Sequence, residues 1–592
     1  MHPSPSSPIH NVLLLPELLA HIALFLDSTR SDLLAAALVC KAWSTVFSAR
    51  LWHTLDMPPL THDCFMDALK QQGHHVRSLK YLGAFDLDAV FSSCPQLTYL
   101  DLTLARSLNL LSLRRMVESL PRLQIVRLNC CYSQGIAWLR ILQDLRCLNV
   151  LELVNDTPEH IIDSIVYAPS GDGNLVEDDN NTEIGSNDDQ QESSIDEQEE
   201  HEDSANDQGS EPDFEWTAVV QDASDAEEEE ANKIDYLGSF LLATASTLTS
   251  LGLENTDLVG LRLFRNIDSP LGANESTPSS SGTSTQDQLP WPTLALKKLR
   301  LAEVGVQRTN LVVEPLLRSC PNLQALDLSG NIDRPWDRFQ WSILSQHCQQ
   351  LTTLDLSQLS CIDNDQLIRA IRLCPGMCTL RAPQSNLASK VLDAIVDVSV
   401  SNKYRPPFQE LDICWCTNIS QVALTRVLQY VPGLKSLKFS WCQQVDLSIF
   451  KKEWTCRDLR VLEAQGLGSN GQEESEADDG DEEHDVESLY MFDRLAQFRS
   501  LRRLAMGSDE VVMRNANGFN QLCSAGLTQL QHLDLVGSDI FPLTPAEVES
   551  MASGFPRLAH LRFSLGLVDA SMQTLLAGAR PDIKQRERQV YF

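Results

Sequence analysis

The sequence is poor in aromatic residues and in cysteines for its length. Phe, Tyr and Trp make up 6% of the 592 residues. The 16 cysteines are too sparse for a small domain held together by disulfides. The N-terminal segment MHPSPSSPIHN lacks the charged start and the small-residue cleavage site of a secretory signal. We therefore expect a protein of a reducing compartment, the cytoplasm, the nucleus or both.

Long apolar runs are also lacking. The longest uncharged apolar run, Tyr236 to Leu253, contains Ser, Thr and Gly residues and falls in register with the repeat described below. A membrane-spanning helix needs about 20 predominantly apolar residues. We therefore expect no membrane-spanning segment and no membrane partner.

Motifs of common enzyme classes are missing from the sequence. It has no phosphate-binding P-loop, no HEXXH zinc motif and no Gly-x-Ser-x-Gly nucleophile motif. One Gly-x-Gly-x-x-Gly pattern occurs at Gly466, Gly468 and Gly471, but the ten carboxylates of residues 471–490 would repel a pyrophosphate. We interpret this pattern as a loop, and we expect a protein that is not an enzyme and binds no cofactor.

Basic residues are absent from two acidic stretches. Residues 171–230 contain 24 Asp and Glu, and residues 471–490 contain ten more, with no Lys or Arg in either. The stretches account for the whole formal charge of −34, because the other 512 residues have 47 acidic and 47 basic side chains. The rest of the chain has no overall basic bias, so we expect no nucleic-acid partner.

Leucine, in contrast, is abundant and periodic. The 91 leucines are about 15% of the chain, and the motif apolar-x-x-apolar-x-apolar recurs fourteen times, mostly at intervals of 25 to 31 residues. Alternate apolar residues direct one face of a short strand into a core, and a fixed interval indicates a repeat architecture. The motif begins at Leu97, Leu123, Leu148, Leu248, Leu296, Leu323, Leu351, Met377, Phe408, Leu434, Leu459, Leu501, Leu530 and Leu558.

Segments of helical periodicity lie between these predicted strands. Residues 364–373 (NDQLIRAIRL) and 420–430 (SQVALTRVLQY) have apolar residues at helical spacing and precede a Cys-Pro or Val-Pro break. Each unit therefore consists of a strand, a turn and a helix. Such a unit cannot bury its own apolar face, so stacked units form a solenoid with strands inside and helices outside.

The repeats resemble the leucine-rich-repeat family in its cysteine-containing form, over about residues 76–580. The most similar units are LDICWCTNIS, LKFSWCQQVD and LDLSQLSCIDNDQL, which begin at Leu411, Leu437 and Leu354. The Asn or Cys position of that family is occupied by Cys131, Asn331, Cys416 and Cys442. The resemblance implies an α/β leucine-rich-repeat solenoid.

Three inserts interrupt the repeats. They are the acidic residues 171–230, the Ser/Thr-rich residues 272–289 and the acidic residues 468–487. Segments of this composition cannot bury enough apolar surface to offset the entropy of ordering, so we expect all three to be disordered. Since the cost of closing a loop grows only slowly with its length, the solenoid tolerates them.

A different pattern precedes the repeats and predicts about three short helices. Pro16 suits a first helical turn, and Leu18, Leu19, Ile22 and Leu26 fall on one helical stripe. A unit of about 45 residues is marginally stable alone. Its surplus of large apolar side chains indicates a binding partner.

This N-terminal pattern resembles an F-box, which we place at residues 10–57. The resemblance rests on LPELL from Leu15, Asp-Leu-Leu from Asp32, VCKAW from Val39 and the pair Leu51-Trp52. F-box proteins dock on the small adaptor of SCF-type cullin–RING ubiquitin ligases. The resemblance places Trp43 and Trp52 inside the unit and assigns to the adaptor interface Leu15, Pro16, Leu18, Leu19, Ile22, Leu33 and Val39.

The two resemblances together imply a function. The chain is expected to be the substrate-recognition subunit of an SCF-type cullin–RING ubiquitin ligase, with the adaptor, through it a cullin, and an unidentified protein substrate as partners. The alternative is a protein-interaction scaffold that uses the F-box and the repeats without ubiquitin transfer. Outward strand positions carry charges of both signs, which indicates no substrate class.

Two tryptophans are the candidate substrate-binding residues. Trp415 and Trp441 follow the strand cores of successive repeats, and successive strands lie about 4.8 Å apart. We expect the indoles to be neighbours that anchor a substrate, with Asp412 and Lys438 as flanking polar contacts. The alternative is that each indole covers the turn below it and stabilises the solenoid.

A zinc site formed by cysteines is the less favoured reading of Cys414, Cys416 and Cys442. Cys416 and Cys442 occupy the Cys position of the repeat, where a small buried side chain is needed. We therefore interpret these thiols as part of the core and expect no bound metal.

Overall fold

The computed structural model describes most of the two regions identified above. It describes residues 15–26, 30–57, 63–81, 87–105, 108–129, 135–155, 235–256, 258, 261, 263–264, 291–306, 309–332, 336, 338–401, 407–467, 490–507, 516–535, 545–563 and 584–585. The inserts at 171–230, 272–289 and 468–487, which we expected to be disordered, lie outside the described residues.

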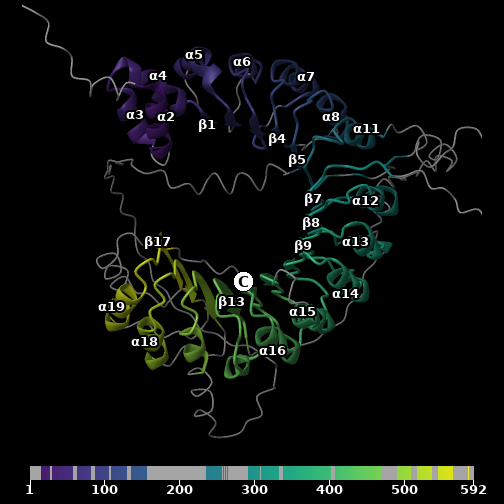
Figure 1. Cartoon of the computed structure of the whole chain (residues 1–592), viewed down its shortest axis with the longest axis vertical. Helices are drawn as coiled ribbons and strands as arrows, with labels where there is room; N and C mark the ends of the chain where they lie inside the picture. Colours follow the sequence, from purple (N-terminus) through teal and green to yellow (C-terminus); the bar gives the residue numbers. More distant parts are fainter. Residues whose placement is uncertain are drawn as a thin grey trace, which may run out of the picture. The chain divides into compact units, whose positions relative to one another are not determined.

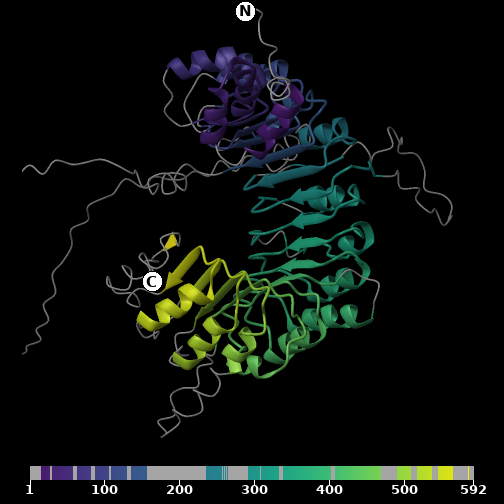
Figure 2. The ribbon, with the colours of Figure 1, turned by 60° about the vertical axis from the view of Figure 1, so that its left-hand side comes forward.

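The described strands form one parallel sheet in which each strand pairs with the next strand along the chain (Figure 1). Figure 2 shows the teal and green strands side by side, with the helices stacked along one side of them. The strands are β1 (Thr54–Met57), β2 (Ser78–Tyr81), β3 (Tyr99–Leu102), β4 (Ile125–Asn129), β5 (Val150–Val154), β6 (Ser250–Glu254), β7 (Lys298–Arg300), β8 (Ala325–Asp327), β9 (Thr353–Asp355), β10 (Thr379–Arg381), β11 (Glu410–Asp412), β12 (Ser436–Lys438), β13 (Val461–Gln465), β14 (Arg503–Gly507), β15 (His532–Leu535), β16 (His560–Phe563) and β17 (Lys584–Gln585).

Helices connect successive strands and cover one face of the sheet. In the repeats they are α5 (Asp63–Gln72), η1 (Gly73–His75), α6 (Leu87–Ser93), α7 (Leu110–Ser119), α8 (Gly135–Leu142), α11 (Tyr236–Ala243), α12 (Thr309–Arg318), α13 (Ser342–His347), α14 (Asn364–Leu373), α15 (Ser389–Ser401), α16 (Gln421–Tyr430), η3 (Leu447–Lys451), α18 (Ala516–Ser524) and α19 (Pro545–Gly554). Within the described residues, none of the helices combines the length and apolar character that a membrane crossing requires.

The predicted helices at residues 364–373 and 420–430 are confirmed as α14 and α16. Each begins at a residue whose side chain caps the first turn. The Asp363 carboxylate accepts hydrogen bonds from the backbone N–H groups of Asp365 and Gln366, and the Ser420 hydroxyl accepts one from Ala423. Such a cap stabilises a helix by about 1 kcal/mol.

One apolar position per strand forms the centre of the core. The motif puts these residues in register, so that Leu354 of β9 lies beside Leu380 of β10 and Leu380 lies beside Leu411 of β11. All three side chains are fully buried between the sheet and the helices. Burying one leucine contributes about 2 kcal/mol, and a single continuous core runs through the repeats. The opposite face of the sheet, which we call the strand face, carries the polar residues of each strand.

The Asn or Cys position closes the turn after each strand. The Asn331 side-chain amide donates to the carbonyl oxygens of Leu301 and Leu328, at 2.6 and 2.8 Å, and its Oδ1 accepts from the N–H of Val304. Cys416 and Cys442 donate their thiols in the same way to Ala382 and Ile413, at 3.0 and 3.2 Å. The residue at this position must therefore be small enough to be buried and must donate a hydrogen bond.

All fourteen predicted strands are confirmed as β3 to β16, but the repeat begins earlier than the motif count indicated. Residues 54–57, which we assigned to the helical unit, form β1 and pair with β2. The apolar positions of β2 are Val76, Leu79 and Tyr81, all buried. The spacing is that of the motif, but valine and tyrosine stand in place of leucine.

The N-terminal unit has three helices, as predicted: α2 (Pro16–Phe25), α3 (Arg30–Ala37) and α4 (Lys41–Leu51). Pro16 occupies the first turn of α2, where its missing N–H costs nothing. Helix α4 packs against both α2 and α3. The three helices share a core that is separate from the core of the repeats. The predicted fold class, an α/β solenoid preceded by a small all-α unit, is confirmed.

Candidate functional site

The core of the N-terminal unit uses two of the residues that we predicted for its surface. Leu19 is 1% exposed and Leu33 is 3% exposed, and both pack around Phe47 of α4. A side chain buried in this way holds the helices together and offers no surface to a partner. The structure thus places Leu19 and Leu33 inside the unit, because helices this small need their most regular apolar positions for their own packing.

The other predicted interface residues lie nearer the surface. Leu15 and Val39 are exposed, and Leu18 and Ile22 are partly buried. Pro16 begins α2, but its side chain is outside the described residues. As predicted for an internal residue, Trp43 is partly buried, and its ring stacks on that of Phe47 with the ring centroids 5.2 Å apart. Trp52 packs instead against the core of the repeats.

Four further large apolar side chains of this unit are exposed. Phe25 is 86% exposed and Leu38 is 79% exposed, and Leu24 and Leu34 are more than half exposed. The sequence contained a signal for them, because α2 (PELLAHIALF) is apolar on more than one face. A helix that buries one apolar face and exposes another indicates a partner. We call these four residues together with Leu15 and Val39 the apolar surface of the N-terminal unit.

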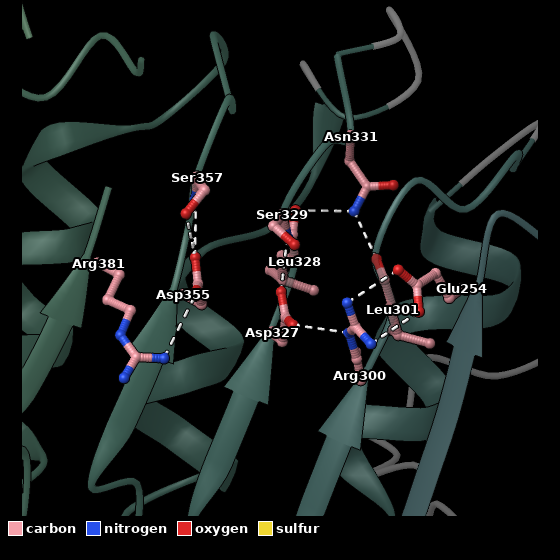
Figure 3. A network of polar contacts seen from close by, with 10 residues as sticks. All are labelled: Glu254, Arg300, Leu301, Asp327, Leu328, Ser329, Asn331, Asp355, Ser357 and Arg381. Carbon is pink, nitrogen blue, oxygen red and sulfur yellow. Dashed lines mark hydrogen bonds and ion pairs between the residues drawn. The ribbon is translucent and has the colours of Figure 1, made fainter. Parts of the chain in front are cut away.

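The strand face carries a ladder of ion pairs that runs across the strands (Figure 3). Arg300 of β7 lies between two carboxylates, 2.7 Å from Oε2 of Glu254 and 3.1 Å from Oδ2 of Asp327. Arg381 of β10 likewise contacts Asp355 and Glu410. Arg127 of β4 shows the same arrangement between acidic residues of β3 and β5. Opposite charges on neighbouring strands stabilise the sheet, so these side chains have partners within the chain.

Two carboxylates of this ladder are adjacent. Asp327 and Asp355 are register partners of β8 and β9. Each accepts a hydrogen bond from the backbone N–H of the serine two residues later, Ser329 or Ser357. Burial raises the pKa of the Asp355 carboxyl, the hydrogen bonds from Ser357 oppose this, and the neighbouring Asp327 raises the pKa further. The pair caps two turns, and we assign it no chemistry.

The two candidate tryptophans are neighbours, as predicted. The ring centroids of Trp415 and Trp441 are 4.9 Å apart and the ring planes differ by 17°. Both residues have positive φ, 61° and 62°, which is uncommon for a residue with a side chain. Their backbone N–H groups donate to Ser440 and Gln465 of the next repeat, at 2.8 and 2.7 Å. This bonding holds the strained backbone in place.

The two indoles differ in their surroundings. Trp415 is 50% exposed, whereas Trp441 is partly buried and lies over Gly466, where a Cβ would come within 2.2 Å of its ring. Trp441 therefore covers the next repeat, which is the structural role that we named as the alternative. Trp415 offers the aromatic surface.

The predicted polar contacts beside the tryptophans are engaged with each other. Nζ of Lys438 lies 3.5 Å from Oδ2 of Asp412 and 3.5 Å from Oε1 of Glu463. Asp412 also accepts a hydrogen bond from the N–H of Cys414 at 3.3 Å. A partner that uses Asp412 or Lys438 must exchange these contacts for its own.

The cysteines of these repeats form no metal site. Within the described residues, no group of three or more His, Cys, Asp and Glu side chains could hold a metal ion. Burial raises the pKa of the Cys442 thiol to about 12, so it is protonated at neutral pH and is a poor metal ligand. The interpretation of Cys416 and Cys442 as core thiols agrees with their complete burial.

Comparison with known protein families identifies the N-terminal unit. Residues 16–58 match the F-box-like family. Among curated proteins, none matches the sequence.

Several solved structures are similar to the chain at low sequence identity. The complex of Rad7 and Elc1 from yeast aligns with 11% identity and a TM-score of 0.40, over 99% of each chain. A complex of TLR13 with ssRNA13 aligns with 11% identity and a TM-score of 0.39, over 86% of this chain and 54% of that chain. A leucine-rich-repeat protein of Leptospira interrogans aligns with 12% identity and a TM-score of 0.29, over 91% of each chain. This chain thus spans about half the length of the TLR13 chain that it matches.

Proposed function

We propose that this chain, which combines an F-box-like domain with a leucine-rich-repeat solenoid, is the substrate-recognition subunit of an SCF-type cullin–RING ubiquitin ligase. The F-box-like domain docks on the adaptor, and the adaptor links it to the cullin. The strand face holds the target protein. The chain itself catalyses nothing, and it acts by raising the effective concentration of the target's lysines near the ubiquitin-carrying enzyme.

The observation that carries this proposal is the apolar surface of the N-terminal unit. Phe25, Leu38 and the neighbouring side chains are exposed although the unit already has a complete core of its own. Exposed apolar side chains gathered on so small a unit mark an interaction site. An F-box-like domain is expected to fill such a site with the adaptor.

The structure changes which residues we propose for the adaptor interface. Leu24, Phe25, Leu34 and Leu38 join Leu15 and Val39 as direct contacts because they are exposed. The partly buried Leu18 and Ile22 lie at its edge, Pro16 fixes the first turn of α2, and Leu19 and Leu33 support the interface from inside.

The target site is proposed on the strand face at β11 and β12. Trp415 supplies the exposed aromatic side chain there, backed by Trp441, and aromatic anchors contribute strongly to protein interfaces. Asp412 and Lys438 lie beside it as an ion pair that a target can replace. Proximity labelling with and without proteasome inhibition identifies candidate targets.

A pair of charge substitutions tests the docking step. We expect the F25D/L38D variant to lose adaptor binding by at least about 30-fold in Kd, because anchor residues contribute on the order of 2 kcal/mol or more. Thermal unfolding of the full chain stays unchanged, since both side chains are exposed. The matched control is Val422→Asp, at a residue of α16 that is 72% exposed, and it binds the adaptor as the wild type does.

Co-purification with the adaptor and the cullin separates the possible functions. Recovery of both proteins with the wild type supports the ligase receptor. Recovery of the adaptor without cullin supports the scaffold that uses the same domains without ubiquitin transfer. Full adaptor binding by F25D/L38D contradicts the proposed interface.

A further inference from the structure

Three basic residues lie side by side on the strand face near the end of the described repeats. Arg503 of β14 is the register partner of His532 of β15, which is the register partner of His560 of β16. The two imidazole rings stack in parallel, with centroids 4.4 Å apart and planes that differ by 6°. The next register position, on β17, is Lys584. We call Arg503, His532 and His560 the basic row.

The basic row breaks a rule that holds elsewhere on the strand face. Arg127, Arg300, Arg381 and Lys438 each lie between two carboxylates of neighbouring strands. In the basic row no acidic residue stands between the three basic ones. Neighbouring groups that repel one another when charged weaken a sheet, so this arrangement has no structural benefit.

The carboxylates around the row are already paired. Glu463 of β13 contacts Arg503 at 3.0 Å and is shared with Lys438, and Asp534 of β15 contacts Arg562 of β16 at 3.3 Å. Both histidines are partly exposed on the strand face. Burial lowers the pKa of His532, and the charges of His560 and Arg503 lower it further. An added anion would remove this repulsion.

We propose that the basic row binds an acidic peptide segment of a partner protein, and that it binds this segment more tightly as the pH falls. The partner is the target only if the proposed function holds, but the binding chemistry does not depend on it. Three residues on successive strands span about 10 Å at the usual strand spacing. A peptide with several carboxylates fits that span better than a single phosphate. The flanking Asp534 and Glu463 disfavour the long phosphate backbone of a nucleic acid.

Fluorescence anisotropy with a labelled peptide of consecutive glutamates tests the proposal. The full chain is used, so that competition from its own acidic inserts is included in the result. Near pH 5.5 the glutamates are still ionised while histidine is protonated. At constant ionic strength we expect the Kd to fall about tenfold between about pH 7.5 and about pH 5.5, because each unit of pKa shift on binding corresponds to tenfold in affinity.

Two histidine variants show whether the row is responsible. In H532Q/H560Q the pH dependence disappears, while Arg503 retains part of the affinity at neutral pH. The matched control is H74Q/H75Q, which removes another adjacent histidine pair, with ring centroids 3.9 Å apart. This control keeps the full pH dependence. Thermal unfolding and adaptor binding, measured in parallel, should be unchanged in both variants.

Several outcomes overturn the proposal. They are binding that does not change with pH, an equal loss of pH dependence in the H74Q/H75Q control, and tighter binding of an oligonucleotide of equal charge. Tighter binding of a peptide with a single phosphoserine than of the glutamate peptide also overturns it, because it assigns the row to phosphate. Since adaptor binding depends on the N-terminal unit, its loss in F25D/L38D neither supports nor weakens the basic row.

Discussion

The indole of Trp441 lies over Gly466 of the next repeat, and a Cβ at position 466 would come within 2.2 Å of the ring atom Cε3. Gly466 has a φ of 64°, in the left-handed region that glycine adopts without cost. Two independent requirements, space for a ring and a left-handed backbone, thus fall on one residue. Glycine is the residue that meets both.

Replacing this glycine should therefore cost more than backbone strain alone. We expect Gly466→Ala to destabilise the chain by clearly more than the roughly 1 kcal/mol of a strained backbone position, because the indole must move. Gly526→Ala is the control, since Gly526 has a φ of 71° and nothing within 4 Å of an added Cβ. Urea unfolding of both variants measures the difference, and equal losses would show that the ring is not held in place.

Removing the two indoles one at a time separates structure from binding. We expect Trp441→Ala to cost at least about 2 kcal/mol, since it loses contacts on both sides, and Trp415→Ala about 1 kcal/mol. Tyr430→Ala, at an exposed aromatic residue of α16, serves as the control and should cost less than either. If Trp415→Ala destabilises the chain as much as Trp441→Ala does, the exposed indole is structural and the proposed target site loses its anchor.

A buried carboxyl in α12 predicts a dependence of stability on pH. Glu314 is buried and accepts a hydrogen bond from the N–H of Gln340. Burial raises its pKa, although this hydrogen bond and the charge of Arg318 oppose the shift. The folded chain then holds the proton more tightly than the unfolded chain, so this group costs stability as the pH rises from the unfolded value through the folded value.

The neutral variant Glu314→Gln should abolish that cost. We expect its melting temperature to match that of the wild type at acid pH, below both pKa values, and to exceed it at neutral pH. Glu549→Gln, at an exposed residue of α19, controls for a general effect of removing one charge. A Glu314→Gln variant that is less stable than the wild type at neutral pH contradicts the assignment.

The described cysteines should divide sharply in their reaction with alkylating reagents. Burial raises the pKa of Cys94 and Cys348 to about 12, and only the thiolate reacts. We expect Cys40, Cys64 and Cys147, which are exposed, to be labelled in the native chain while the buried thiols are protected. Peptide mass spectrometry before and after denaturation gives the result. Rapid native labelling of Cys94 or Cys348 would contradict the packing of the core.

The strands could be predicted because one chemical requirement recurs in each of them. Leu354, Leu380 and Leu411 fill equivalent places in the core, so the motif that marks one marks them all. Prediction failed at β1 and β2, where Tyr81 and Met57 occupy such places. Any large apolar side chain satisfies the core there, and a search for leucine does not find it.

The N-terminal interface was predicted less well for a physical reason. A helical pattern shows which residues are apolar, but Leu19 and Phe25 are equally apolar, and only packing decides which of them faces inward. The basic row escaped the sequence reading as well. Its residues are 28 to 29 positions apart in the chain, and it is the strand register that brings them together.

The strand register has a consequence for how this chain can change over time. Val150 pairs directly with Ser250, although one hundred positions separate them in the sequence. Their separation in space is one strand spacing, about 4.8 Å, the same as between strands joined by short connections. A partner lying across the strand face thus measures distance in strands and not in residues. Connections between strands can lengthen, shorten or acquire new sequences while the ruler that the partner reads keeps its divisions.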